Sequence, residues 1–111
     1  MPTTAEAYGS MMVFSVEPAL TGAEEDAFRH AVSEQIRAGG RWFVLDLARV
    51  GRFDSRGLET LLWFQEQVEA VQGIVKMAGL KGNGRKTFEM VRFDRKFEVF
   101  ENVQEAVKSF H

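Results

Sequence analysis

The sequence predicts an α/β fold in which helices are packed on a mostly parallel sheet of four to five strands. Short apolar runs at residues 11–16, 42–47, 74–78 and 97–100 alternate with longer segments whose apolar residues recur at helical spacing. The run at 42–47 is nearly continuous, which is typical of a strand buried on both faces of a parallel sheet. Strands that alternate with helices are joined by right-handed crossovers, so we expect one layered sheet.

The chain of 111 residues is expected to form one small domain. At this size a chain buries roughly two-thirds of its unfolded surface, which suffices for one core without a metal or a disulfide. The first strand is expected at residues 11–16. Residues 1–10 show no periodicity, so we expect a flexible tail there and a single domain over residues 11–111.

The helix that connects the first two strands should begin after Thr21. Thr21 and Glu24 have the spacing of a capping box, in which each side chain accepts a hydrogen bond from the backbone N–H of the other end. Apolar side chains then recur at helical spacing from Phe28 to Ile36, and Gly39 provides a stop signal.

The second half of the chain continues the alternation. The longest helix follows the buried strand, and Asn102 is a cap for the last helix. The expected elements are a helix at 55–72, a strand at 74–78, a helix at 85–91, a strand at 97–100 and a helix from 103 onward.

Composition excludes several classes of function. The 14 basic and 16 acidic residues give a net charge of −2, and the absence of cysteine excludes disulfides, thiolate metal sites and a cysteine nucleophile. No apolar run approaches the roughly 20 residues of a membrane span, and the first residues lack the basic start of a secretion signal. We therefore expect a cytoplasmic protein that binds no membrane, no metal and no cofactor.

The charges are unevenly distributed along the chain. Residues 1–40 carry two basic and six acidic side chains, whereas residues 76–96 carry seven basic and two acidic ones. Domains that bind duplex nucleic acid usually have a pI above about 9, and this chain is acidic overall. We therefore interpret the basic segment as a solvated or partner-facing surface and expect no nucleic acid as a partner.

The glycine-rich loop at residues 79–87 approaches the phosphate-binding motif but does not match it. The motif requires Lys and then Ser or Thr directly after its second glycine, whereas Arg85 separates Gly84 from Lys86. One position on a helix is a rotation of about 100°, so Lys86 would point away from a phosphate held at Gly84. We interpret the loop as an ordinary strand-to-helix turn, with nucleotide binding as the alternative.

A second polar turn lies where the buried strand meets the longest helix. Asp54 and Ser55 are ordinary helix-capping residues, and Gly57 allows close approach of another backbone. In open parallel sheets, functional groups gather where a strand ends and the next helix begins. This turn is therefore the leading candidate for a functional site.

With its surroundings, this turn resembles the STAS domain, a family named for sulfate transporters and anti-sigma factor antagonists. The resemblance rests on Val44-Leu45-Asp46-Leu47, on Phe53-Asp54-Ser55-Arg56-Gly57-Leu58, and on Leu61, Leu62 and Gly73. The predicted order of elements also agrees with that family. The resemblance implies a STAS-like fold and a regulatory switch rather than an enzyme.

In antagonist members of that family, a serine at the position of Ser55 is phosphorylated by a partner that is both a serine kinase and an anti-sigma factor, and a phosphatase restores it. The resemblance implies that the unphosphorylated protein binds this partner and frees a sigma factor. A phosphate at a helix N-terminus gains from backbone N–H groups and the helix dipole, which is compatible with this role. A scaffold or sensor subunit of a larger signalling assembly is the alternative.

Two arginines lie beside this serine. Family members commonly have a small residue where this chain has Arg56, and Arg52 lies just upstream. Guanidinium groups form strong bidentate hydrogen bonds to phosphate, so these two could hold a phosphorylated Ser55 or be contacted by the partner.

The helix after Ser55 has an apolar side and a polar side. At about 100° per residue Trp63 falls opposite the apolar side, and its large rigid ring suits an interface anchor. Contact with a neighbouring loop or self-association through a second copy of the chain is the alternative for this ring. The predicted partner-binding residues, around Ser55 as phosphorylation site, are Arg52, Asp54, Arg56, Gly57, Glu59, Trp63 and Gln67.

No catalytic residues are predicted. General acid–base chemistry needs histidine or paired carboxylates in a cleft, and the two histidines lie in the first helix and at the C-terminus. A receiver-like domain, with magnesium bound by Asp46 and Asp54, is a rival interpretation. It would also need a third acid and a lysine, for which Glu17 and Lys81 are the candidates.

Overall fold

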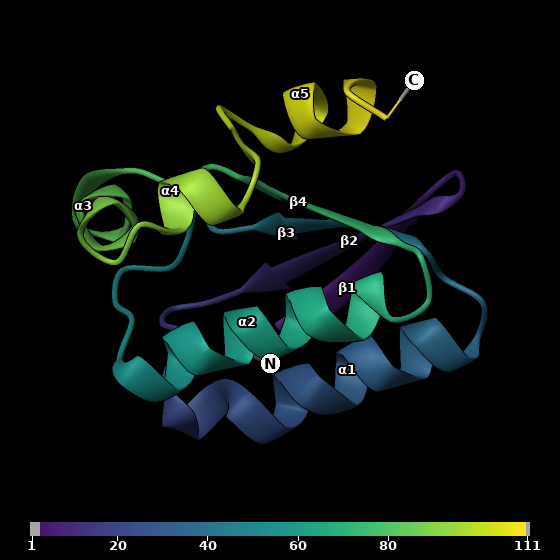
Figure 1. The fold of residues 1–111 in the computed structure, drawn as a ribbon, viewed down its shortest axis with the longest axis horizontal. Helices are drawn as coiled ribbons and strands as arrows, with labels where there is room; N and C mark the ends of the chain where they lie inside the picture. The colour runs from purple at the N-terminus through teal and green to yellow at the C-terminus, as the bar shows by residue number, and fades with distance from the viewer. Residues whose placement is uncertain (1–2, 111) are drawn as a thin grey trace.

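The computed structural model describes residues 3–110 and contains a five-stranded sheet with helices on both faces (Figure 1). The strands are β1 (Thr3–Tyr8), β2 (Met11–Val16), β3 (Trp42–Asp46), β4 (Ile74–Ala78) and β5 (Val99–Phe100). They lie in the sheet in chain order; β1 is antiparallel to β2, and β2 to β5 are parallel. The predicted α/β class with a mostly parallel sheet is confirmed.

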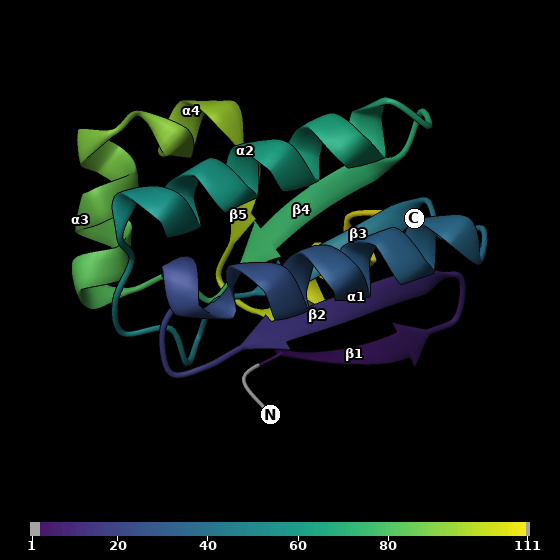
Figure 2. The same ribbon diagram turned by 90° about the horizontal axis from the view of Figure 1, so that it is seen from below.

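The helices cover the two faces of the sheet unequally. They are η1 (Gly22–Glu24), α1 (Glu25–Arg37), α2 (Ser55–Glu69), α3 (Gly82–Met90), α4 (Phe93–Lys96) and α5 (Val103–Lys108). Right-handed crossovers that advance in one direction place their helices on one face, and α1 and α2 lie there side by side (Figure 2). The opposite face is covered by the short α5 (Figure 1). No helix within residues 3–110 is both long and apolar enough to span a membrane.

The helices begin at the predicted caps. The backbone N–H of Thr21 donates to Glu24 Oε1 at 2.7 Å, and Thr21 Oγ1 accepts from the Ala23 N–H at 3.3 Å, which completes a capping box. At the start of α5, Asn102 Oδ1 accepts from the Glu105 N–H at 2.9 Å. Both predicted caps are confirmed.

Phenylalanine rings form the centre of the core between the sheet and the α1–α2 pair. Phe14 and Phe43 extend from the strands, Phe28 from α1 and Phe64 from α2, and all four are fully buried. The ring centroids of neighbouring pairs lie 5.3 to 6.0 Å apart, mostly edge to face. Such pairs contribute about 0.5–1.5 kcal/mol beyond their buried area, so this cluster fixes both helices on the sheet.

The face beneath α5 has a smaller core and a buried lysine. The apolar residues of this core are Val13, Val44, Ala78 and Ala106. Lys76 of β4 is buried beside them, and its ammonium donates to Ser109 Oγ at 2.8 Å and to the Ser109 carbonyl at 3.2 Å. The same ammonium lies 4.4 Å from the centroid of the Phe110 ring. Lys76 therefore holds the end of α5 against the sheet.

The prediction of a flexible tail over residues 1–10 was wrong for Thr3–Tyr8, which form β1. An edge strand whose side chains are mostly exposed needs no apolar alternation, so the pattern that identified the other strands is absent here. A turn signal was present: Gly9, with a φ of +62°, and Ser10 form the two-residue loop between β1 and β2.

The segment between β4 and β5 also differs from the expectation. The helix expected at 85–91 begins at Gly82, and the one-turn α4 follows it, so β5 is shorter than the expected strand at 97–100. Arg92 adopts a left-handed φ of +66° between α3 and α4. This conformation is rare outside glycine and asparagine, so an arginine gives no sequence signal for the reversal.

We expect the replacement of Phe64 by alanine to lower the free energy of unfolding by about 3–5 kcal/mol, because the lost ring leaves a cavity among three other rings. Urea denaturation followed by circular dichroism measures this loss. Phe64→Leu retains more of the volume and should lose distinctly less. A loss below about 1 kcal/mol for Phe64→Ala would show that the helices do not depend on the aromatic cluster.

Candidate functional site

The turn that contains Asp54 and Ser55 lies between β3 and α2, and Ser55 is the first residue of α2. Asp54 precedes the helix in an extended conformation, and its Oδ1 accepts from the Gly57 N–H at 2.8 Å. Ser55 is exposed. The first backbone N–H groups of a helix have no partner inside the helix, so the Ser55 hydroxyl stands at a positively polarised end of α2.

The second oxygen of Asp54 reaches the segment before α1. Asp54 Oδ2 accepts from the Gly22 N–H at 3.1 Å, so one carboxylate joins the starts of two helical segments. The N–H groups of Gly57 and Gly22, and to a lesser degree the charge of Arg52, hold the pKa of the Asp54 carboxyl below its ordinary value of 3.8. A fixed negative charge therefore lies next to Ser55.

Gly57 is required by the close approach of these two segments. A Cβ at this position would overlap the backbone carbonyl oxygen of Leu20, so a side chain would push α2 away from the turn before α1. The Leu20 N–H also donates to the Arg52 carbonyl at 2.9 Å, and Leu20 forms a parallel bridge with Phe53. The candidate site therefore comprises both turns, not only the one that contains Ser55.

Arg56 is engaged by an ion pair with α1. Its Nε and Nη2 lie 3.0 and 2.6 Å from Glu25 Oε1, and Arg29 Nε donates to Glu25 Oε2 at 2.8 Å. These hydrogen bonds, with that of Arg56 the stronger, hold the pKa of the buried Glu25 below its ordinary value of 4.5, and Glu25 in turn raises the pKa of Arg56. Of the two arginines beside Ser55, only Arg52 is without an ion pair inside residues 3–110.

The prediction that Trp63 lies on the solvent side of its helix was wrong. The side chain is half-buried and packs against the main core, and the Arg29 guanidinium lies 4.6 Å from the centroid of its ring. A helical wheel shows only which side of α2 is apolar; here α1 lies alongside and covers part of the other side. Glu59 and Gln67 are exposed as expected. A docking role for these α2 residues stays a prediction.

The glycine-rich loop after β4 is explained by packing. Gly79 has a φ of +83°, and a Cβ there would lie 2.9 Å from the Ala48 Cβ. Arg85, the residue that interrupts the phosphate-binding motif, donates to the Leu80 carbonyl at 3.1 Å, and Gly84 packs against Phe53. Gly79, Gly84 and Arg85 of this loop therefore have structural roles.

The three carboxylates that a receiver-like magnesium site would need each have a different partner within the chain. Asp46 Oδ1 accepts from the Ala48 N–H at 3.0 Å, Asp54 caps α2, and Glu17 lies 3.3 Å from Arg49. Among the described residues 3–110, no group of three His, Cys, Asp or Glu side chains is arranged to hold a metal ion.

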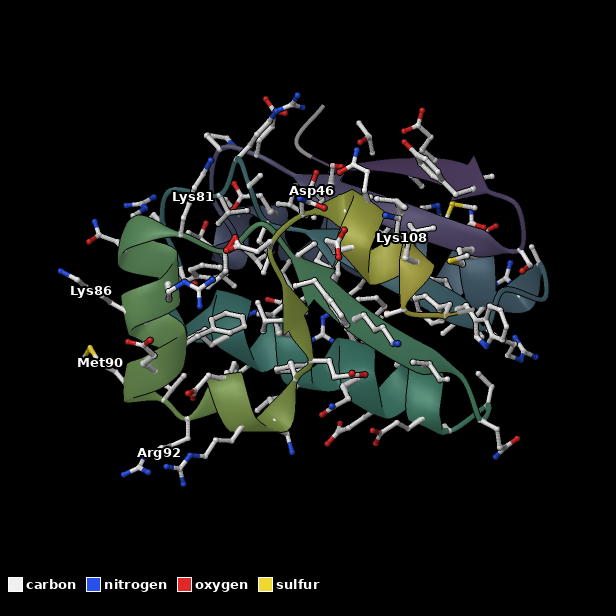
Figure 3. The ribbon with its side chains drawn as sticks, turned by 90° about the horizontal axis from the view of Figure 1, so that it is seen from above. Asp46, Lys81, Lys86, Met90, Arg92 and Lys108 are labelled. Carbon is white, nitrogen blue, oxygen red and sulfur yellow. The ribbon has the colours of Figure 1, made fainter. Side chains whose placement is uncertain are left out.

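The basic segment divides into a buried lysine and an exposed surface. Lys76 lies beneath α5 and does not contribute to the surface. Lys86 and Arg92 project outward from α3 and the turn that follows it, and Met90, 82% exposed, lies on the same helix (Figure 3). Lys81, at the start of α3, is exposed and lies at the edge of the sheet. The interpretation as a surface therefore applies to residues 81–96 only.

Comparison with known proteins agrees with this geometry. A family model described as the STAS domain matches residues 3–106. BtrV of Bordetella bronchiseptica, named as a candidate anti-sigma factor antagonist, is 27% identical over 110 residues, which cover 99% of this chain and 95% of BtrV.

Solved structures show the same fold at lower identity. An anti-sigma factor antagonist from Mycobacterium paratuberculosis matches with a TM-score of 0.84 at 20% identity, and the match covers 96% of this chain and 91% of the Mycobacterium chain. The Bacillus cell fate determinant SpoIIAA, in its phosphorylated form, matches with a TM-score of 0.77 at 19% identity, and the match covers 98% of this chain and 99% of the SpoIIAA chain.

We expect Gly57→Ala to lower the free energy of unfolding by about 1–3 kcal/mol, because the new methyl group collides with the Leu20 carbonyl. Gly22→Ala is the matched control: a Cβ there lies 3.6 Å from the Arg56 side chain, an ordinary contact, so its effect should stay within about 0.5 kcal/mol. Chemical denaturation compares the two variants. Equal stabilities would contradict the close approach.

Acid is expected to weaken the fold through Glu25 and Asp54. Both carboxyls have lower pKa values in the folded protein than their ordinary 4.5 and 3.8, so their stabilisation is complete above those values and is lost as the pH falls through the folded ones. The Glu25→Gln variant has no carboxyl at this position, so it lacks the part of the pH-dependent stabilisation that Glu25 contributes. Its melting temperature, measured from neutral pH to about pH 3, should fall less steeply than that of the wild type or of the exposed control Glu66→Gln. Parallel curves would refute the role of Glu25.

Proposed function

Because this chain belongs to the STAS domain family, we propose that it acts as an anti-sigma factor antagonist whose docking is switched by phosphorylation of Ser55. The proposed partner is an anti-sigma factor with serine kinase activity, which the unphosphorylated chain binds so that a sigma factor is freed. A phosphoserine phosphatase would restore the binding form. The names of BtrV and of the Mycobacterium protein support this proposal.

The observation that carries the proposal is the exposed hydroxyl of Ser55 at the start of α2, beside the Asp54 carboxylate, whose orientation is fixed by hydrogen bonds. Ser55 is accessible, and both oxygens of Asp54 are held by backbone N–H groups. The chain needs to supply no chemistry of its own, since a regulator of this kind has only to present the hydroxyl to a kinase.

A phosphate at this position would change the surface and leave the fold intact. Phosphorylation adds a charge of about −1.5 to −2 next to the Asp54 carboxylate. Arg56 is already engaged by Glu25, which leaves Arg52 as the arginine beside Ser55 that can neutralise part of the added charge. The remainder of the double charge would face the partner. A loss of about 1.4 kcal/mol in the free energy of binding raises the Kd tenfold. A double negative charge placed in the interface readily costs more than this.

The proposed docking surface surrounds Ser55 on α2 and the two adjoining turns. Arg52, Glu59 and Gln67 are exposed, whereas Trp63 is half-buried and its ring lies against the Arg29 guanidinium. Charged residues at the rim of an interface act mainly on the association rate and on specificity.

Comparison of three baits tests the switch. We expect wild-type protein and Ser55→Ala to capture from lysate a protein with a histidine-kinase-like ATPase domain, identified by mass spectrometry, and Ser55→Asp to lose it, because the aspartate imitates part of the phosphate charge. The captured protein with ATP should then phosphorylate the wild-type chain on Ser55.

Ser10→Asp adds the same charge at an exposed position in the loop between β1 and β2 and serves as the control, which should capture the partner like the wild type. Identical captures by Ser55→Asp and the wild type would exclude the switch. Capture of other signalling proteins, unaffected by Ser55→Asp, would favour a scaffold or sensor role instead.

A further inference from the structure

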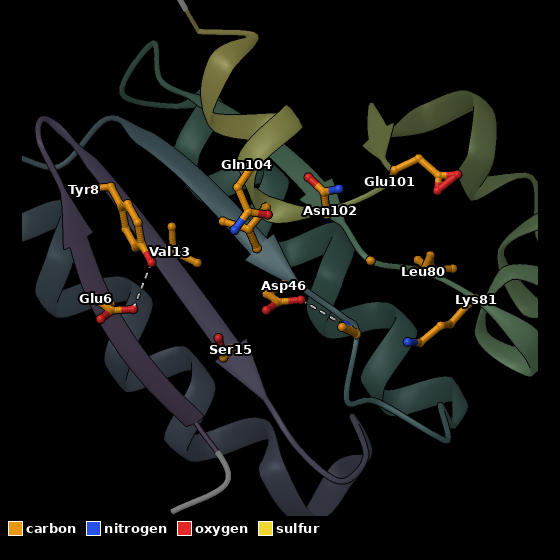
Figure 4. A pocket seen from close by; sticks show the side chains of 13 residues that line it. Glu6, Tyr8, Val13, Ser15, Asp46, Leu80, Lys81, Glu101, Asn102 and Gln104 are labelled. Carbon is orange, nitrogen blue, oxygen red and sulfur yellow. Dashed lines mark hydrogen bonds between the residues drawn. The ribbon is translucent and has the colours of Figure 1, made fainter.

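A cavity of about 410 Å³ lies on the face of the sheet that carries α5, at the carboxyl ends of the parallel strands (Figure 4). It forms because α5 has six residues and covers only part of this face. Small-molecule sites occupy about 300–1,000 Å³, and in open α/β sheets they lie outside the carboxyl ends of the strands. The cavity is on the opposite face from α1 and α2 and does not include Ser55.

The residues on this face change from apolar to polar where the cavity begins. On β2, Val13 is followed on the same face by Ser15, and on β3, Val44 is followed by Asp46. The two valines are buried beneath α5, whereas Ser15 and Asp46, which are neighbours in the strand register, are half-buried in the cavity wall. The polar character of the cavity is therefore built into the central strands and not only into its rim.

Four charged side chains line this cavity, of which Glu6, Asp46 and Glu101 are acidic and Lys81 is basic. Asp46 comes from the end of β3 and Lys81 from the cap position of α3, and both line the cavity. The Lys81 side chain extends toward the Asp46 side, whereas the carboxylate of Glu101 is directed away (Figure 4). The Asp46 carboxylate and the Lys81 ammonium lie farther apart than the 4.0 Å of an ion pair.

Further hydrogen-bonding groups surround the space between these charges. The Gln104 amide, from α5, is directed over the sheet toward the region between Val13 and Asp46 (Figure 4). An amide offers two donors and an acceptor, and Asp46 keeps acceptor capacity beyond the bond from Ala48. On the far wall, the Tyr8 hydroxyl donates to Glu6 at 3.4 Å.

We propose that this cavity binds a small zwitterion of the amino-acid class, with its ammonium at Asp46 and its carboxylate at Lys81. A simple anion would be repelled by the acidic side chains of the lining, and a simple cation would leave Lys81 without a partner, whereas a molecule that carries both charges satisfies both Asp46 and Lys81. Hydrogen bonds in which a partner is charged are about twice as strong as neutral ones, so the two ends determine the orientation of the ligand. Gln104 contacts the remainder.

Titration of the ¹⁵N-labelled full chain with each standard amino acid, up to about 10 mM, tests the proposal by NMR. At least one amino acid should bind with a Kd below about 1 mM and shift the amide signals of Ser15, Asp46, Lys81 and Gln104. Its N-acetyl derivative lacks the ammonium and its methyl ester lacks the carboxylate; each should bind at least tenfold more weakly.

Two variants assign the ends of the ligand. Asp46→Asn keeps an oxygen for the Ala48 N–H, and Lys81 is exposed, so both variants should fold. The Asp46→Asn variant should bind the amino acid at least tenfold more weakly than the wild type does, and with the same affinity as it binds the N-acetyl derivative. The Lys81→Gln variant should bind the amino acid and its methyl ester with equal affinity. Lys86→Gln, on the exposed surface of α3, should bind normally.

Three results would overturn the proposal. The first is that no amino acid shifts these signals at about 10 mM. The second is an ester or N-acetyl derivative that binds as tightly as the free amino acid, because the cavity would then recognise a single charge. The third is unchanged affinity in both Asp46→Asn and Lys81→Gln.

Discussion

The Asp54 carboxylate holds together the two turns at the end of the molecule that carries Ser55. One oxygen caps α2 through Gly57, and the other holds the segment before α1 through Gly22. The contact is possible only because Gly57 has no side chain to meet the Leu20 carbonyl. The residue that builds the turn therefore also sets the negative charge beside Ser55, so its structural role and the regulatory role proposed for it rest on the same carboxylate.

A chain of charged and aromatic contacts continues from this turn into the adjacent helix. Arg56 and Arg29 converge on the buried Glu25, and Arg29 also covers the Trp63 ring. Exposed ion pairs contribute little to stability, but removing either guanidinium group leaves one oxygen of the buried Glu25 carboxylate without its hydrogen bond. The surface around Ser55 is therefore formed by α1 and α2 as one unit.

The features that sequence reasoning predicted are those specified by local patterns. The apolar runs identified β2 to β5, and the capping residues Thr21, Asp54 and Asn102 marked helix starts, because each acts within a few residues of chain. Strand β1 is an exposed edge, so burial left no pattern in it. The position of Trp63 depends on where α1 lies, and the cavity depends on how far α5 extends over the sheet. Both are properties of packing between distant segments.

The short α5 has a consequence for the dynamics of the molecule. An isolated helix of six residues is unstable in water, so α5 persists only through contacts such as Lys76 with Ser109 and the stacking of Phe110 on Trp42. Elements held by few buried contacts open at free energies well below that of global unfolding. We therefore expect the amide hydrogens of α5 to exchange with solvent through local openings that expose one face of the sheet while the aromatic core on the other face stays closed.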